Sequence, residues 1–274
     1  MGIVTPGISE VDKYIYIDGG AIRSAARKYA IFFKDTEVQI NWEALRGQHQ
    51  RAFYYDALPG GKNQNESIEQ FNQRVEETRI RYDAMRIHEG LFVNYGVSYK
   101  RRKRVEQKRV DTMIAVDMLT HAQRGLIEEA TILTNDQDFY PVIVAVMELG
   151  VKVKLICDSE KTNDEFMYIS DKTTTIDLKL FHTWIAQDVR QEFSLPVEHH
   201  RKRSGSSNWS EGTLHIGKMN GGSWEFWDSE AKKSYVHNEL RQLVSYCIVK
   251  YPDCDRLNTL LESIKIGGEA ALPT

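Results

Sequence analysis

The residues best suited to chemistry in this sequence are four aspartates in three separate segments: Asp18, Asp111, Asp136 and Asp138. Carboxylates that crowd together repel one another and raise each other's pKa, so such a cluster is normally neutralised by a cation. Mg²⁺ and Mn²⁺ prefer oxygen ligands, and in phosphodiester cleavage they activate water and stabilise the leaving oxygen. If the fold brings the four aspartates together, we expect a metal site that needs no histidine or cysteine nucleophile.

Asp18, Asp111 and Asp136 also have a simpler interpretation as helix caps, because Asp is favoured at helix N-termini for hydrogen-bond and dipole reasons. For any single residue this interpretation is at least as good as a metal ligand. The metal site is favoured by the four residues together, and by the two carboxylates in the one turn 136–138. Asp117 follows Asp111 by six residues and therefore lies about 240° around a helix, so we expect it only to support the site.

The elements that position these aspartates are expected to alternate between strand and helix. Apolar and β-branched runs predict strands over 14–17, 51–55, 91–97, 130–133 and 151–156, and helical spacing predicts helices over 21–29, 68–88, 139–149 and from Asp111 onward. This alternation predicts a parallel sheet, and such sheets bind ligands at the carboxyl ends of their strands. Asp18 and the turn 136–138 lie at those ends, so three segments can deliver carboxylates to one sheet edge.

The composition changes beyond Trp184, where a polar stretch over 188–209 predicts a linker. Residues 1–187 then form one domain and residues 210–274 a small α+β domain of unknown role. In the second domain, strands are expected over 214–219 and 223–227 and a helix over 238–250. Its aromatic residues Trp224, Phe226 and Trp227 are expected to form a core rather than to stack on bases.

A basic run lies just before Asp111, with seven Lys or Arg among the ten residues from Lys100 to Arg109. The net charge of −3 means that any phosphate-binding surface must be local. This run could lead a nucleic-acid backbone toward the aspartates; a solvated, flexible loop is an equal alternative. The candidate nucleic-acid-binding residues are Lys100, Arg101, Arg102, Lys108 and Arg109.

Composition excludes several classes of protein. The charged fraction of 27% and apolar fraction of 41% are those of an ordinary globular protein. The three cysteines lack the short-spaced pairs of a zinc site and are too few for a disulfide scaffold. Neither a secretory signal nor an 18-residue apolar stretch is found, so we expect a cytoplasmic protein without membrane contact.

Three motifs resemble the NYN family, which includes LabA-like proteins and is related to the PIN and flap-nuclease fold. They are Tyr14-Ile-Tyr-Ile-Asp-Gly-Gly20, Lys108-Arg-Val-Asp-Thr-Met-Ile-Ala-Val-Asp117 and Ile132-Leu-Thr-Asn-Asp-Gln-Asp-Phe-Tyr-Pro141. The resemblance implies a three-layer, PIN-like parallel-sheet α/β domain and a Mg²⁺- or Mn²⁺-dependent ribonuclease with Asp18, Asp111, Asp136 and Asp138 as its acidic set. This chain departs from the family at Ala21, where some relatives have asparagine, and at Thr134-Asn135, where Ser-Gly is usual.

Two other functions compete with a ribonuclease that cleaves single-stranded RNA. One is an RNA-binding module without turnover, which would hold RNA through the basic run. The other is a metal-dependent phosphatase, although Asp18-Gly-Gly20 lacks the paired aspartates of the common aspartyl-phosphate pattern. A homo-oligomer is compatible with either domain.

Overall fold

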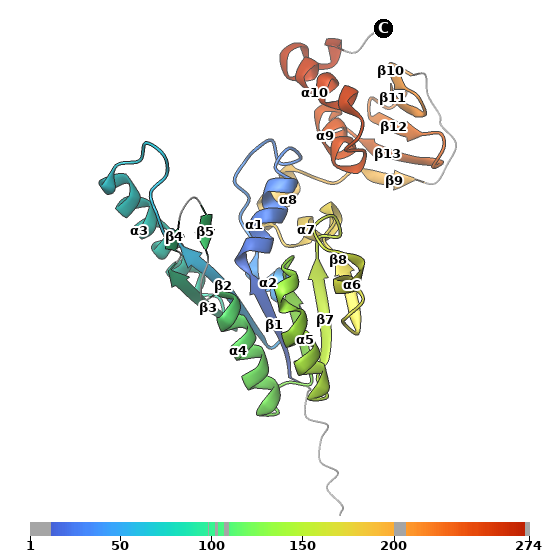
Figure 1. Cartoon of the computed structure of the whole chain (residues 1–274). Helices are drawn as coiled ribbons and strands as arrows, with labels where there is room; N and C mark the ends of the chain where they lie inside the picture. The colour runs from blue at the N-terminus through green and yellow to red at the C-terminus, as the bar shows by residue number, and fades with distance from the viewer. Residues whose placement is uncertain (1–11, 98, 102–103, 107–109, 200–206, 272–274) are drawn as a thin grey trace, which may run out of the picture. The chain divides into compact units, whose positions relative to one another are not determined.

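The computed structural model describes residues 12–97, 99–101, 104–106, 110–199 and 207–271 (Figure 1). The chain divides into two compact units. Unit 1 comprises Met1–Arg27 and Ile40–Trp184, and unit 2 comprises Lys28–Gln39 and Ile185–Thr274.

Unit 1 is built on a six-stranded sheet in the order β3-β2-β1-β6-β7-β8. All five neighbouring pairs are parallel. The strands are β1 (Lys13–Asp18), β2 (Arg51–Leu58), β3 (Leu91–Val97), β6 (Glu129–Leu133), β7 (Lys152–Cys157) and β8 (Lys172–Thr175). The parallel α/β fold expected from the alternation is therefore confirmed, and the edge strand β8 is an addition to it.

The central strands are buried on both faces, as near-continuous apolar runs predict for a parallel sheet. All five residues of β6 are buried, and so are the four inner residues of β1. In the register of the sheet, Asp18 pairs with Tyr55 of β2, and Ile17 pairs with Leu133 of β6. The carboxyl ends of β1, β2 and β6 therefore lie side by side.

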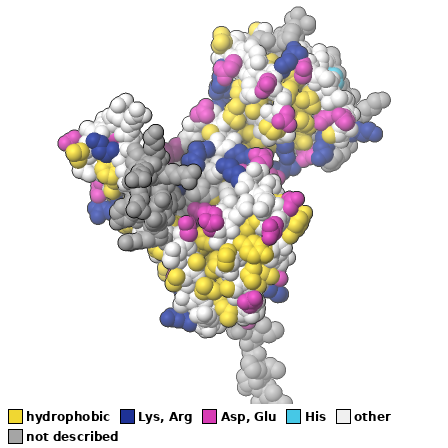
Figure 2. Space-filling model, in the orientation of Figure 1, with side chains coloured by type: hydrophobic (Ala, Val, Ile, Leu, Met, Phe, Trp, Pro, Cys, Tyr) yellow, Lys and Arg dark blue, Asp and Glu magenta, His cyan; other side chains and the backbone are white. Residues whose placement is uncertain are grey.

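Two helices cover one face of this sheet, α4 (Val110–Gln123) and α5 (Tyr140–Glu148), with the short 3-10 turn η1 (Gln137–Phe139) leading into α5. Ile114 and Met118 of α4 and Ile143 of α5 are fully buried in one cluster with the aromatic side chains of β1 and β2. The outer side of α4 also carries an exposed apolar residue, Val116, and Figure 2 shows hydrophobic side chains gathered on the surface of this part of unit 1.

The opposite face is covered by α1 (Gly19–Lys28), α2 (Trp42–Arg46) and α3 (Ile68–Met85). On this side of the sheet, the ring of Tyr54 of β2 packs against Trp42 of α2 and Tyr82 of α3. The helix α3 begins at a capping box formed by Ser67 and Gln70, which satisfies backbone groups at its N-terminus. Unit 1 thus has three layers, with a sheet between two sets of helices.

Shorter elements complete unit 1: the hairpin β4 (Tyr99–Arg101) and β5 (Arg104–Glu106), and the helices α6 (Asp164–Met167) and α7 (Leu178–Thr183). No helix among the described residues is long and apolar enough to cross a membrane.

Unit 2 contains a five-stranded antiparallel sheet in the order β10-β11-β12-β13-β9. Its elements are α8 (Gln187–Glu192), β9 (Val197–His199), β10 (Trp209–Glu211), β11 (Leu214–Lys218), β12 (Trp224–Asp228), β13 (Lys233–His237), α9 (Leu240–Lys250), α10 (Asp255–Gly267) and η2 (Gly268–Ala271). Trp224, Phe226 and Trp227 are all buried, as expected of core residues. Part of the span expected as a linker, 188–209, forms the edge strand β9.

The segment Lys28–Gln39, which follows α1, also belongs to unit 2. Phe32 and Phe33 are fully buried. The ring of Phe32 meets Tyr246 of α9 edge to face, and that of Phe33 meets Phe193 in the same way. Gln242 Nε2 donates a hydrogen bond of 3.2 Å to the carbonyl oxygen of Phe32. The C-terminal unit therefore takes part of its core from the first fifth of the chain.

Candidate active site

Asp18 is the last residue of β1, and its carboxylate is held in place by two hydrogen bonds. Oδ1 accepts from the backbone N–H of Gly20 at 2.7 Å, and Oδ2 accepts from the hydroxyl of Thr134 at 3.1 Å. Burial raises the pKa of Asp18, while these hydrogen bonds oppose the rise. The strand end and the first turn of α1 thus fix one carboxylate at the carboxyl edge of the sheet.

Thr134 connects this carboxylate to the next one. It follows β6 directly and is fully buried, and its Oγ1 accepts a hydrogen bond of 3.1 Å from the backbone N–H of Asp136. One hydroxyl therefore ties Asp18 to the turn that carries Asp136 and Asp138. The departure from the usual serine at this position keeps the hydroxyl that makes these bonds.

Asp136 is also a cap, because its Oδ1 accepts a hydrogen bond of 2.9 Å from the backbone N–H of Asp138 at the start of η1. The capping role expected of it is confirmed. Oδ1 of Asp136 is used in this way, whereas no hydrogen bond to its Oδ2 is found among the described residues.

Asp111 lies in the first turn of α4, and its pKa is raised to about 6. Desolvation is the largest cause, followed by the negative charges of Asp136, Asp18 and Asp138. Each of these charges disfavours the ionised form of Asp111. The four aspartates from three segments therefore lie within electrostatic reach of one another.

Among the described residues, no group of three or more His, Cys, Asp or Glu side chains is close enough to hold a metal ion as it stands. The donor chemistry fits Mg²⁺ or Mn²⁺, since the four clustered side chains are carboxylates, the oxygen ligands that these hard ions prefer. The repulsion expressed in the pKa of Asp111 is also of the kind that a divalent cation relieves. Asp18, Asp111, Asp136 and Asp138 would hold such an ion.

Beside Asp18, the structure places an ion pair that the sequence analysis missed. Arg23 of α1 pairs with Asp56 of β2, whose side chain is only 1% exposed. Asp56 Oδ2 also accepts a 2.7 Å hydrogen bond from the hydroxyl of Tyr54, and Oδ1 accepts one of 2.7 Å from the N–H of Ala57. The charge of Arg23 lowers the pKa of Asp18. A cation is thus fixed beside the acidic cluster by a buried carboxylate.

The sequence feature that could have revealed this ion pair is Asp56, an acidic residue at the end of the second strand. The expected strand ended at residue 55, whereas β2 continues to Leu58 and includes Asp56. Because β2 lies next to β1, its last residues reach the same edge as Asp18.

Asp117 has a structural partner and does not belong to the acidic cluster. Its Oδ2 accepts a 2.7 Å hydrogen bond from the hydroxyl of Tyr55, and one turn later His121 Nδ1 shares a 2.8 Å hydrogen bond with the hydroxyl of Tyr16. These bonds join the inner side of α4 to β2 and β1. Asp117 therefore supports the site by holding the helix that carries Asp111.

The basic run is described only in part. Lys100 and Arg101 belong to strand β4. In its pairing with β5, Lys100 is opposite Val105 and Arg101 is opposite Arg104. Arg102, Lys108 and Arg109 lie outside the described residues. Their proposed contacts with nucleic acid stay a prediction.

Of the comparisons with known proteins, a family model agrees with the motifs. The family model of the NYN domain matches residues 13–177, and no curated protein matches the chain significantly. Among solved structures, a protein of unknown function from Vibrio parahaemolyticus is similar over 65% of this chain and 98% of its own, at 11% identity and a TM-score of 0.41. The matched residues comprise the whole parallel sheet and all four aspartates, and NYN domains have a PIN-like nuclease fold. The chain therefore belongs to the NYN domain family.

Proposed function

We propose that this protein is a metal-dependent ribonuclease that hydrolyses phosphodiester bonds of single-stranded RNA at the carboxyl edge of its parallel sheet. The observation that carries the proposal is the placement of the aspartates: Thr134 joins Asp18 to the turn of Asp136 and Asp138 by hydrogen bonds. The charges of these three residues reach Asp111 and help to raise its pKa. This is the charge density that a divalent ion would neutralise. The family's nuclease fold supports the same reaction class.

The chain's own residues would act by holding and orienting groups. Asp18 is pinned by Thr134 and Gly20, so its oxygens keep a fixed position without rearrangement during the reaction. Arg23 offers a positive charge beside Asp18 that can attract a phosphate oxygen. Bound Mg²⁺ or Mn²⁺ supplies activation of water and stabilisation of charge on the phosphate. No cysteine or histidine nucleophile is needed.

The test is cleavage of single-stranded RNA, single-stranded DNA and a phosphomonoester, each with Mn²⁺, Mg²⁺ or a chelator. We expect metal-dependent cleavage of RNA alone. Asp136→Asn should abolish it without loss of folding, because the substitution removes a metal ligand's charge but keeps the oxygen that caps η1. The control is Asp253→Asn, an exposed aspartate of unit 2, which should leave the rate unchanged.

Each alternative gives a different result. RNA that is bound but never cut with either metal would favour a binding module without turnover. Hydrolysis of the phosphomonoester alone would favour a phosphatase. An unchanged rate in Asp136→Asn would reject the assignment of the site.

A further inference from the structure

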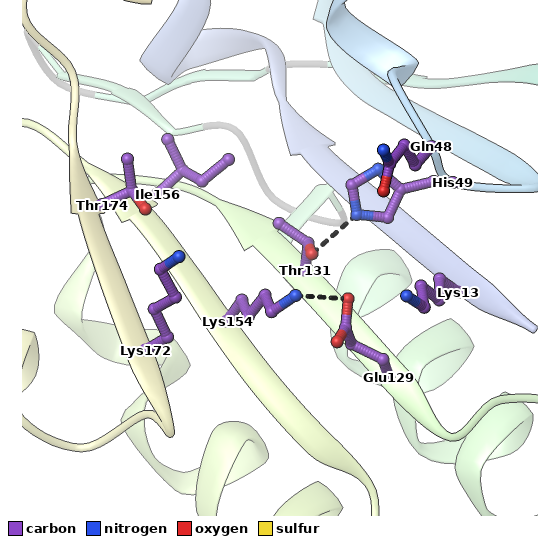
Figure 3. Close-up of a pocket in the computed structure, with 9 residues that line it drawn as sticks. All are labelled: Lys13, Gln48, His49, Glu129, Thr131, Lys154, Ile156, Lys172 and Thr174. Atoms are coloured by element: carbon purple, nitrogen blue, oxygen red, sulfur yellow. Dashed lines mark hydrogen bonds and ion pairs between the residues drawn. The ribbon is translucent and has the colours of Figure 1, made fainter. Parts of the chain in front are cut away.

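A polar pocket lies on one face of the same sheet, across β1, β6, β7 and β8 (Figure 3). It extends from Lys13 of β1 and Glu129 of β6, the first residues of their strands, to Ile156 and Thr174 near the carboxyl ends of β7 and β8. Lys13 and Asp18 stand at opposite ends of β1, which at about 3.3 Å per residue places those backbone positions about 16 Å apart. None of the four aspartates lines the pocket, so it is distinct from the candidate active site.

The pocket has an excess of positive charge. Lys13, Lys154 and Lys172 line it together with a single carboxylate, that of Glu129. Lys154 Nζ pairs with Glu129 Oε1 at 2.7 Å, as Figure 3 shows. Within the part of the chain that the structure describes, no ion pair is found for the side chains of Lys13 and Lys172. Among the described residues, the ammonium groups of Lys13 and Lys172 at this pocket thus have no carboxylate partner.

His49 does not add to this charge at neutral pH. Its Nδ1 lies 2.6 Å from the carbonyl oxygen of Arg46 and must donate to it; in the neutral ring Nε2 then accepts a 2.8 Å hydrogen bond from the hydroxyl of Thr131. Burial lowers the pKa of His49. The His49 ring is thus a neutral part of the pocket lining, and the unpaired positive charge comes from the ammonium groups of Lys13 and Lys172.

We propose that this pocket binds a phosphate group. Its volume of about 160 Å³ has room for several water molecules and hence for a phosphate group. Lysine ammoniums act on phosphate as point charges, and the three that line this pocket come from β1, β7 and β8. The hydroxyl of Thr174 and the amide of Gln48 add neutral polar groups to the lining.

The first experiment is calorimetric titration of the full-length protein with inorganic phosphate, in chelator so that no divalent ion takes part. We expect saturable binding that the double substitution Lys13→Gln and Lys172→Gln weakens at least tenfold. The control is Lys152→Gln, which removes one positive charge, as the single variant Lys172→Gln does, from an exposed position on β7 outside the pocket and should weaken binding less than twofold. A single Lys172→Gln variant serves if the double variant fails to fold.

Either of two results would overturn the proposal: no saturable phosphate binding by the parent protein, or equal weakening by Lys152→Gln and by Lys172→Gln. The second experiment identifies the source of the phosphate. Displacement of phosphate by adenosine monophosphate would indicate a free nucleotide, and displacement by 5′-phosphorylated but not 5′-hydroxyl RNA would indicate an RNA end. Displacement by neither would identify inorganic phosphate itself as the ligand.

Discussion

Asp111 reports the charge at the acidic edge more directly than its neighbours, because Asp136, Asp18 and Asp138 all raise its pKa. Its side chain lies at the start of α4, partly open to solvent. A helix N-terminus normally stabilises a carboxylate, yet the pKa of Asp111 rises to about 6. Desolvation and the repulsion among the carboxylates therefore outweigh the helix dipole at this residue.

This rise predicts how stability depends on pH in metal-free protein. A carboxyl group whose pKa is raised on folding contributes stability that is fully present below its unfolded pKa of about 3.9 and is lost as pH rises. For Asp111 the loss is complete once the pH has passed its folded pKa of about 6. In chelator, Asp111→Asn should therefore raise Tm at pH 7.5 more than at pH 4.5, as measured by calorimetry.

Adding Mg²⁺ should then raise Tm at pH 7.5 in the parent protein and less in Asp111→Asn, because the variant has lost a ligand. The exposed control Asp253→Asn should behave as the parent does. An equal change of Tm at both pH values in Asp111→Asn would contradict the electrostatic account of this residue.

The acidic residues could be predicted from the sequence, because each lies beside a strand or a helix start that the apolar pattern marks. The position of Arg23 beside them could not be predicted from the sequence. Arg23 and Asp56 meet only because α1 packs over the end of β2, and no local pattern states which strand neighbours β1. The pocket lysines were missed for the same reason, since they come together only once the strands are placed in order.

The junction between β1 and α1 is the element on which the site depends most closely. Gly19 and Gly20 follow Asp18 without a loop and begin the helix at once. A Cβ added at Gly19 would lie 2.4 Å from Asp56 Oδ2 and 2.5 Å from the hydroxyl of Tyr54. The strand can turn into the helix only because residue 19 has no side chain.

Gly19→Ala should therefore destabilise unit 1 by about 1–3 kcal/mol, the usual cost of overpacking a filled site. The buried carboxylate of Asp56 cannot move aside without weakening its bonds to Tyr54 and Arg23. Urea unfolding followed by circular dichroism measures this change. Gly221→Ala is the matched control, because nothing lies within 4 Å of an added Cβ there; equal losses in the two variants would refute the argument from close approach.

Among the elements, those with strong apolar patterns were predicted within a few residues. The strand β6 was expected over 130–133 and forms over Glu129–Leu133. The edge strand β8 was missed because its sequence, Lys172–Thr175, is short and polar, and it is a strand only through its pairing with β7. The hairpin of β4 and β5 lies within the basic run, where charge hides the alternation of a strand.

At the scale of the whole molecule, unit 2 is not continuous in sequence. Its sheet and helices come from residues after Ile185, but Lys28–Gln39 belongs to it as well. Sequence composition placed a boundary near residue 187 and could not place the earlier segment, because its partners, such as Phe193 and Tyr246, lie far along the chain. The contact between Gln242 and Phe32, 210 residues apart, is visible only in three dimensions.

This borrowed segment predicts that one early substitution destabilises the C-terminal unit. Phe32→Ala removes a fully buried ring that contacts Tyr246, and such a loss typically costs about 3–5 kcal/mol. Hydrogen exchange measured by mass spectrometry should show faster exchange in peptides from β11, β12, β13 and α9, while peptides from β6 and β7 keep their protection. Thr36→Ala, an exposed position in the same segment, should change neither set. Unchanged protection of the unit 2 peptides in Phe32→Ala would mean that the segment Lys28–Gln39 does not contribute to the core of unit 2.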